Sequence, residues 1–168
     1  MARSPFCSHD TAMTTAPTST PAVGAPAPDF TLASTSGARV TLSALRGRRV
    51  LLAFFPAAFT SVCTAEMCAF TDDYDAFAAE GVTVLPISVD PVPTLQDFKA
   101  QHAMRVELLS DEGGAVARAY GVLLAAKPVA NRAYFLVGED GTVRWAHVEE
   151  HPGFRRENAE ILAAIRAA

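Results

Sequence analysis

The stretch from residue 50 to residue 68 reads VLLAFFPAAFTSVCTAEMC and does most to decide the fold. Its first six residues, 50–55, are continuously apolar, which is typical of a strand buried at the centre of a sheet. Pro56 ends this strand, and residues 61–80 favour a helix that Gly81 ends. The stretch therefore predicts a central strand, a turn and a helix.

Two cysteines lie in this stretch, Cys63 where the helix should begin and Cys68 five residues later. The first turn of a helix carries the positive end of the backbone dipole and N–H groups that lack helical partners. Both favour the thiolate, which is the reactive form of cysteine. A second thiol nearby can react with whatever the first one forms. The alternative is that these are ordinary buried cysteines.

The rest of the chain supplies further strands and helices around this centre. Alternating or apolar runs predict strands at residues 29–32, 39–42, 82–89, 133–137 and 142–148, and helices at 94–102, 111–119 and 158–167. The first two strands form a hairpin extension at the N-terminus. This order predicts an α/β fold with a mixed central sheet flanked by helices on both faces. Ligand sites in such sheets lie beyond the carboxyl ends of strands, which is where Cys63 falls.

The composition is that of one globular domain. The chain has 168 residues, of which 50% are hydrophobic and 19% charged, with a formal net charge of −4. This charge argues against nucleic acid or an anionic membrane as the main partner, and no apolar run approaches the roughly 20 residues of a membrane span. Three cysteines are too few for a disulfide-stapled secreted scaffold. We expect a cytoplasmic protein in which a close cysteine pair is catalytic or binds a metal.

Residues 1–22 differ from the rest because they are rich in Ala, Pro, Thr and Ser and lack an apolar period. They have no apolar segment of the kind found in a signal peptide. We expect a disordered tail over 1–22 and a folded domain over 23–168. Met13 is an alternative translation start, and Cys7 is then a bystander.

The spacing Pro56-x3-Thr60-x2-Cys63 is similar to the active-site signature of peroxiredoxins. The wider run from Phe55 to Cys68 resembles the bacterioferritin comigratory protein group, also called the Q-type peroxiredoxins. Residues 87–91 and 131–137 look more like the alkyl hydroperoxide reductase E-type branch. The resemblance runs from about Val23 to the C-terminus.

This resemblance implies a thioredoxin-like fold with added N-terminal strands. It also implies reduction of hydrogen peroxide or organic hydroperoxides without a metal, cofactor or prosthetic group. Cys63 would attack the peroxide and become a sulfenic acid, Thr60 would orient the peroxide, and Pro56 would screen the sulfur. Arg132 would steady the thiolate and the charge that grows on the leaving oxygen, a task that suits its fixed charge and forked donors.

Three more residues are candidates near the substrate. Glu66 lies one helical turn beyond Cys63 and would buttress Arg132, unless it is simply an exposed helix carboxylate. Phe55 and Phe59 would line the substrate mouth, although core packing is the simpler role for the phenylalanines. His102, His147 and His151 have no metal-ligand spacing with the cysteines.

Cys68 is the candidate for the second half of the chemistry. In the bacterioferritin comigratory group, a cysteine at this spacing resolves the sulfenic acid as an intramolecular disulfide. Residues five apart in an ideal helix have Cα atoms about 8–9 Å apart, whereas a disulfide needs less than about 7 Å. The helix would therefore have to unwind locally for a Cys63–Cys68 disulfide to form. A buried helix cysteine with no such role is the alternative.

The function and partners expected from the resemblance follow this chemistry. The first hypothesis is a thiol peroxidase recycled by thioredoxin or a glutaredoxin-like donor, either monomeric or a homodimer. The E-type branch lacks the second cysteine, so a one-cysteine peroxidase that borrows an external thiol is an alternative. Two further hypotheses are a redox sensor with the same cysteine chemistry and a non-catalytic thioredoxin-fold binding module.

Overall fold

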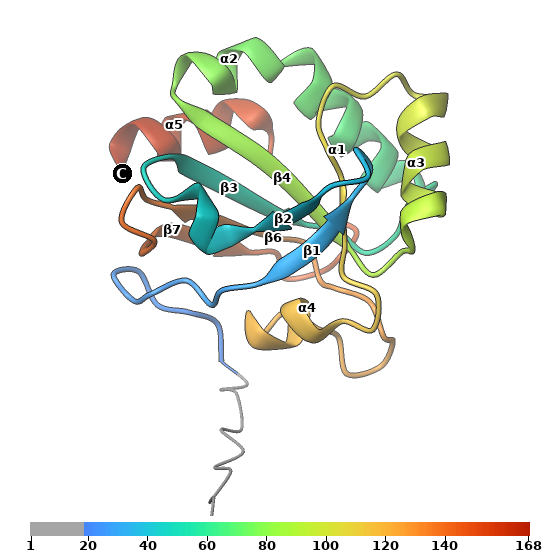
Figure 1. Cartoon of the computed structure of the whole chain (residues 1–168), viewed down its shortest axis with the longest axis horizontal. Coiled ribbons are helices and arrows are strands. Elements are labelled where there is room, and N and C mark those ends of the chain that lie inside the picture. The colour runs from blue at the N-terminus through green and yellow to red at the C-terminus, as the bar shows by residue number, and fades with distance from the viewer. Residues whose placement is uncertain (1–18) are drawn as a thin grey trace, which may run out of the picture.

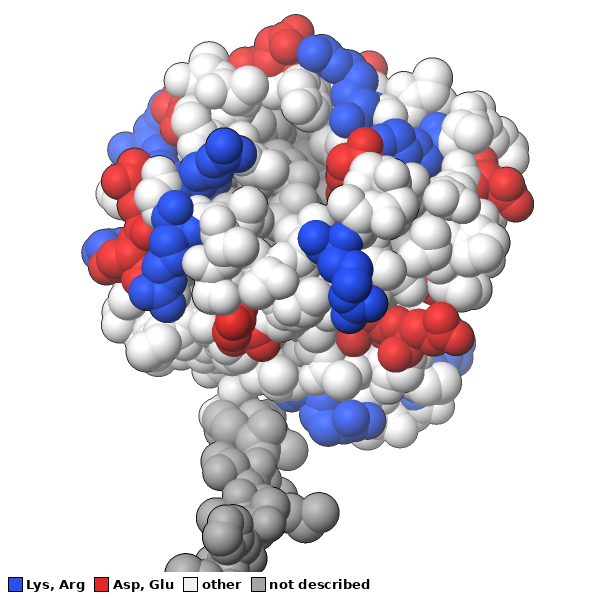
Figure 2. Space-filling model, viewed as in Figure 1, with Lys and Arg blue, Asp and Glu red and all other residues white. Residues whose placement is uncertain are grey.

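A computed structural model gives the fold of the protein and describes residues 19–168. Cys7, Met13 and most of the predicted tail over 1–22 lie outside the described residues, so those expectations stay predictions. Within residues 19–168, no helix combines the length and the apolar character that crossing a bilayer requires. On the face shown in Figure 2, acidic and basic side chains are interspersed, with no extended area of one sign.

The centre of the molecule is a seven-stranded mixed sheet in the order β2-β1-β5-β4-β3-β6-β7. The strands are β1 (Thr31–Ser34), β2 (Arg39–Thr41), β3 (Arg49–Phe54), β4 (Val82–Ser88), β5 (Leu109–Ser110), β6 (Ala133–Val137) and β7 (Val143–Val148). β4 runs parallel to both β3 and β5, whereas β6 runs antiparallel to β3 and β7. The predicted N-terminal hairpin is β1 and β2, and β1 joins it to the sheet through β5.

Helices cover both faces of this sheet, as the sequence predicts. They are the 3-10 helix η1 (Leu42–Leu45) and the α-helices α1 (Ser61–Asp72), α2 (Tyr74–Ala79), α3 (Val92–Gln101), α4 (Ala115–Ala119) and α5 (Asn158–Ala167). Figure 1 shows α1, α2 and α5 above the sheet and α4 below it. The fold is thioredoxin-like α/β with an N-terminal β-hairpin extension.

Two apolar layers hold the helices to the sheet, because successive side chains of β3 point to opposite faces. Leu51 and Ala53 contact the layer under α1, α2, α3 and α5, which also contains Cys63. Leu52 and Phe54 contact the layer under α4 and the N-terminal hairpin. All four β3 side chains are fully buried. β3 therefore anchors both halves of the core.

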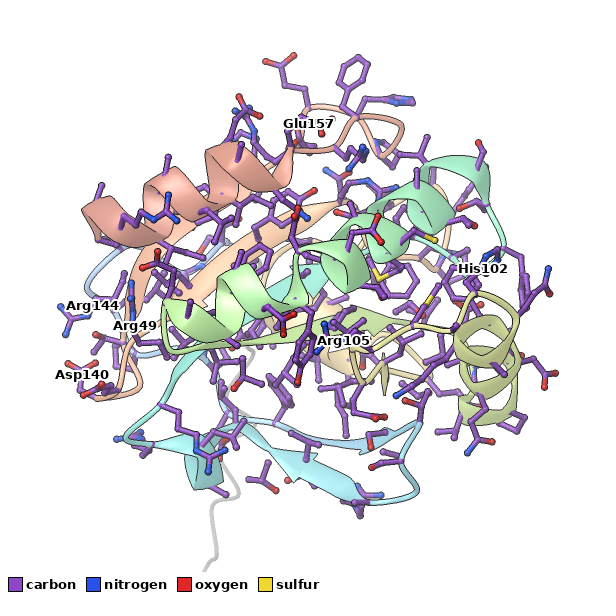
Figure 3. The ribbon with its side chains drawn as sticks, turned by 90° about the horizontal axis from the view of Figure 1, so that it is seen from above. Arg49, His102, Arg105, Asp140, Arg144 and Glu157 are labelled. Atoms are coloured by element: carbon purple, nitrogen blue, oxygen red, sulfur yellow. The ribbon has the colours of Figure 1, made fainter. Side chains whose placement is uncertain are left out.

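The two ends of the sheet carry different residues. Figure 3 shows Arg49, Asp140 and Arg144 together at one end, around the start of β3 and the β6–β7 turn. Cys63 follows the other, carboxyl end of β3, where the loop from Pro56 leads into α1. This is the end that the sequence predicts for the site.

Candidate active site

Cys63 lies at the N-terminus of α1. The first backbone hydrogen bond of the helix runs from the Thr64 N–H to the Thr60 carbonyl oxygen at 2.9 Å. The N–H groups of Ser61, Val62 and Cys63 therefore have no acceptor one turn back, and the Thr60 side chain does not cap them. Only 1% of Cys63 is exposed. The thiol thus sits at the positive end of the helix dipole and away from bulk water.

Arg132, the residue before β6, contacts the sulfur directly. Its Nη2 donates to Cys63 Sγ at 3.1 Å. Nη2 and Nε also donate to the Pro152 carbonyl oxygen, at 3.1 and 3.3 Å, and Nη1 pairs with a carboxylate oxygen of Glu66. Burial lowers the pKa of Arg132, but Glu66 and Cys63 outweigh it and raise the pKa above the ordinary value. The guanidinium is therefore charged and fixed in orientation.

Glu66 is as buried as the arginine that it pairs with. Its second oxygen, Oε1, accepts a hydrogen bond from the Tyr134 hydroxyl at 2.5 Å. Burial raises the pKa of Glu66 above its ordinary value, although Arg132 and Tyr134 act in the opposite direction by stabilising the carboxylate. Glu66 is thus a buried partner of Arg132, as its predicted buttressing role requires, and not an exposed helix carboxylate.

Pro56 and Thr60 lie in the loop between β3 and α1. Pro56 is half-buried and Thr60 is exposed. The Thr60 hydroxyl donates to the Ala57 carbonyl oxygen at 3.0 Å. Its proton is thus engaged with the backbone in this conformation, and its lone pairs can accept a hydrogen bond from a ligand.

The two candidate mouth residues lie in different places. Phe59 is 48% exposed and has a φ of 63°, a left-handed backbone conformation that is uncommon outside glycine. Phe55 is fully buried and belongs to the core layer under α1. Both rings pack against Phe98. The distance between ring centroids is 5.0 Å for Phe59 and 6.5 Å for Phe55. Phe55 therefore supports the site from behind, whereas Phe59 borders solvent.

Cys68 is half-buried in α1, and both cysteines are free thiols. The helix is continuous from Ser61 to Asp72, so it contains Cys63 and Cys68 together. The two residues are five positions apart in regular helix, at the spacing of about 8–9 Å between Cα atoms that ideal geometry gives. The structure therefore brings Arg132, Glu66 and Cys63 into contact and leaves Cys68 as a separate thiol on the same helix.

Three further groups support the site, and no motif in the sequence assigns them this role. Asp90, after β4, accepts hydrogen bonds from the Ala58 N–H and the Ser88 hydroxyl, both at 2.8 Å, and so holds the loop before α1. Tyr134 and the Pro152 carbonyl hold Glu66 and Arg132. The sequence does hold one signal for Tyr134. It lies two positions after Arg132, and residues two apart on an extended strand point to the same face of the sheet.

His102 and His147 lie in different elements of the fold. His102 packs on Phe98 with ring centroids 5.4 Å apart, and Figure 3 shows it at the end of α3. His147 is in β7 and stacks with Tyr134 and Trp145. Within residues 19–168, no group of three His, Cys, Asp or Glu side chains is arranged to hold a metal ion.

Comparison with known proteins identifies a family and relatives that match most of the chain. Residues 23–146 match the AhpC/TSA family. Alkyl hydroperoxide reductase E of Mycobacterium tuberculosis is 40% identical over 151 residues, which cover 86% of this chain and 98% of that protein. The putative peroxiredoxin bcp of Coxiella burnetii is 36% identical over 127 residues, covering 72% of this chain and 84% of the relative.

Solved structures are similar over most of the chain. The crystal structure of peroxidoxin BcpB from Mycobacterium tuberculosis has a TM-score of 0.77 and 33% identity, covering 88% of this chain and 97% of that one. The reduced 2-Cys peroxiredoxin of Plasmodium vivax has a TM-score of 0.80 and 32% identity, with 86% and 80% covered. The chain therefore belongs to the AhpC/TSA family, in its bacterioferritin comigratory or Q-type group of peroxiredoxins, and is a thiol-dependent peroxidase.

Proposed function

We propose that Cys63 is the peroxidatic cysteine and that the protein reduces hydrogen peroxide and organic hydroperoxides. The observation that carries this proposal is the contact of 3.1 Å between Arg132 Nη2 and Cys63 Sγ at the N-terminus of α1. A helix N-terminus and a guanidinium both stabilise a thiolate. The mycobacterial relative is named an alkyl hydroperoxide reductase, which supports this class of substrate.

In the first step, the Cys63 thiolate attacks one oxygen of the hydroperoxide. A sulfur–oxygen bond forms while the oxygen–oxygen bond breaks, and the leaving hydroxide or alkoxide takes a proton to become water or an alcohol. Cys63 ends as a sulfenic acid, oxidised by two electrons. In this proposal Arg132 stabilises negative charge in the transition state, Thr60 accepts a hydrogen bond from the peroxide, and Pro56 screens the sulfur.

In the second step, we propose that Cys68 resolves the sulfenic acid. Its sulfur attacks Cys63 Sγ, a disulfide forms, and the oxygen leaves as water. Because both residues lie in one continuous helix, the first turns of α1 must unwind before the sulfur atoms can meet. A dithiol donor, thioredoxin or a glutaredoxin-like protein, then reduces the disulfide by exchange.

Stopped-flow oxidation of the reduced protein, followed by mass spectrometry, tests both steps. One equivalent of peroxide should give a monomer two mass units lighter, with a tryptic cross-link between Cys63 and Cys68. Cys63→Ser should abolish peroxide consumption. Cys68→Ser should react once and then stop as a sulfenic acid. Cys7→Ser is the matched control and should turn over like the parent.

A one-cysteine mechanism is the second candidate, and the intact helix between the two cysteines favours it. In that mechanism an external thiol resolves the Cys63 sulfenic acid. Turnover of Cys68→Ser with thioredoxin at the parental rate would assign the protein to this mechanism. A parent that consumes no peroxide would overturn the proposed function altogether.

A further inference from the structure

Tyr134 is buried beside the active site and its hydroxyl is used twice. The hydroxyl donates to Glu66 Oε1 at 2.5 Å and accepts from the Arg156 backbone N–H at 3.1 Å. The side chain is fully buried. Its ring packs beside two β7 side chains, with its centroid 6.5 Å from the ring centroids of both Trp145 and His147. The position of the hydroxyl is therefore fixed, because the ring packs against β7 and the oxygen takes part in two hydrogen bonds.

We infer that Tyr134 is a positioning residue. Its hydroxyl fixes the Glu66 carboxylate, and the carboxylate in turn fixes the orientation of the Arg132 guanidinium toward Cys63. The inference rests on the proposed roles of Cys63 and Arg132. The Tyr134 hydroxyl itself touches neither the sulfur nor the peroxide.

The Glu66 carboxylate has two oxygens, and both are engaged. One oxygen pairs with Arg132 Nη1 and the other accepts from Tyr134. Without the hydroxyl, Oε1 would be a buried acceptor that has lost its donor, and such groups rotate, take up a proton or destabilise the fold. Each of these responses weakens the anchor of Nη1 and releases the guanidinium that contacts Cys63.

The charged and titratable groups around Glu66 all bear on this anchor. Arg132 and Tyr134 face it from the β6 side, Cys63 lies one turn away on its own helix, and Arg155 acts from the segment after β7. The hydrogen bond from Tyr134 favours the ionised carboxylate. Loss of that bond therefore raises the pKa of Glu66, and a larger fraction of the carboxyl is protonated at a given pH.

The same hydroxyl also links Glu66 to the segment that provides the second group holding Arg132. The segment after β7 supplies the Pro152 carbonyl oxygen, which accepts from Nε and Nη2 of Arg132. Four residues later, the Arg156 N–H donates to the Tyr134 oxygen. Tyr134 thus connects the two groups that hold Arg132, the Glu66 carboxylate and the Pro152 carbonyl.

Tyr134→Phe removes only the hydroxyl and tests the inference by stopped-flow oxidation of Cys63 across pH. We expect oxidation at neutral pH to be on the order of tenfold slower, because a hydrogen bond to a charged group is lost. The acid limb of the pH–rate profile should move to higher pH. Tyr120→Phe is the matched control. Tyr120 is equally buried and donates to the Pro28 carbonyl at 2.8 Å on the other face of the sheet, so its loss should leave the profile unchanged.

A double-mutant cycle with Glu66→Gln separates positioning from general destabilisation. If Tyr134 acts through Glu66, adding Tyr134→Phe to Glu66→Gln should slow oxidation much less than it slows the parent. A difluorotyrosine at position 134 keeps the shape and donates more strongly, so it should move the acid limb to lower pH even if Tyr134→Phe does not fold.

The outcomes distinguish this inference from the proposed function. A parent whose Cys63 is not oxidised by peroxide overturns the proposed function itself. A parent that reacts, with a Tyr134→Phe variant of equal or faster rate and an unmoved profile, overturns only the role of Tyr134. Additive effects of the two substitutions in the cycle would also overturn it.

Discussion

Arg132 illustrates at the residue scale how this protein tolerates a buried charge next to a reactive thiol. A guanidinium out of water is costly unless its donors are matched. Here Nη1 faces Glu66, Nη2 faces Cys63 and Pro152, and Nε faces Pro152. Each nitrogen has an acceptor, and together these acceptors fix the orientation of the guanidinium. The residue is thus committed to this site and is not an incidental surface arginine.

Arg132→Met should slow Cys63 oxidation by roughly 100- to 1,000-fold. Loss of one preorganised donor typically raises the activation free energy by about 2.7–4 kcal/mol. Methionine fills similar space but donates no hydrogen bond. The measurement is the second-order rate constant with hydrogen peroxide. Because the substitution leaves the Glu66 carboxylate buried without its cation, the folded fraction is checked by circular dichroism and Arg132→Met/Glu66→Gln is prepared beside it. A folded variant with the parental rate would leave Arg132 with a structural role alone.

The sequence predicts the residues that carry a motif and one supporting residue, Glu66, but it gives no role to the other groups that hold the site. Cys63 follows from the strand-turn-helix pattern, and Arg132 from its resemblance to a family arginine. The Pro152 contribution is a backbone carbonyl, which no side-chain pattern encodes. The conformation of the Thr60 hydroxyl, turned to Ala57, also depends on the folded loop.

At the scale of elements, α1 combines two requirements that oppose each other. Its N-terminus favours the Cys63 thiolate only while the first turn is formed. The proposed disulfide with Cys68 forms only when that turn is open. The proposed cycle therefore requires the helix to alternate between a reduced and an oxidised conformation during turnover.

Oxidation with one equivalent of peroxide should increase amide hydrogen exchange across residues 61–71. The reason is that the backbone hydrogen bonds of the first turns of α1 cannot survive the approach of the two sulfur atoms. Exchange in α5 serves as the internal control and should stay the same. Unchanged protection across α1 after a disulfide has formed would contradict the distance argument.

Glu107 connects the N-terminal hairpin to α3, and this link should depend on pH. Burial raises the pKa of its carboxyl, but Lys99 and Thr35 outweigh this, so the pKa lies below the ordinary value. A lowered folded-state pKa gives stability that is present above the unfolded value and lost as pH falls through the folded one. The Glu107 side chain is 42% exposed, so solvent screening limits the contribution to a few tenths of a kcal/mol. Urea unfolding should show Glu107→Gln less stable than the parent at pH 7 and equal to it at pH 3; an equal difference at both values would refute the link.

Element boundaries were predictable where local signals mark them. β6 occupies the predicted residues 133–137, followed by Gly138, and α5 occupies the predicted 158–167. The single helix predicted over 61–80 was wrong, because the structure has two helices that meet at Asp73. β5 was missed, since a strand of two residues is defined only by its partners β1 and β4.

At the scale of the whole molecule, the sequence predicts a mixed sheet with helices on both faces, and the structure confirms it. The strand order could not be derived in the same way. β3 and β6 pair although about 80 residues separate them, and local patterning carries no record of such contacts. The resulting sheet makes two core layers share one set of strands.

This sharing predicts that the described domain unfolds in one cooperative step. Phe54 lies in the layer toward α4, where it contacts Tyr120 and Phe135, whereas Phe70 lies in the layer toward α1 and contacts Phe77. Both side chains are fully buried, so alanine at either position should lower the free energy of unfolding by about 3–5 kcal/mol.

Urea unfolding followed by tryptophan fluorescence and by far-UV circular dichroism checks this coupling. Trp145 packs against the layer that contains Phe70, so its fluorescence reports on one layer, whereas circular dichroism reports on the whole chain. In Phe54→Ala the two signals should shift together, although the substitution is on the other face of the sheet. Separate transitions would mean that the layers unfold independently. Coincident transitions would mean that the two layers unfold as one unit, as expected when β3 belongs to both.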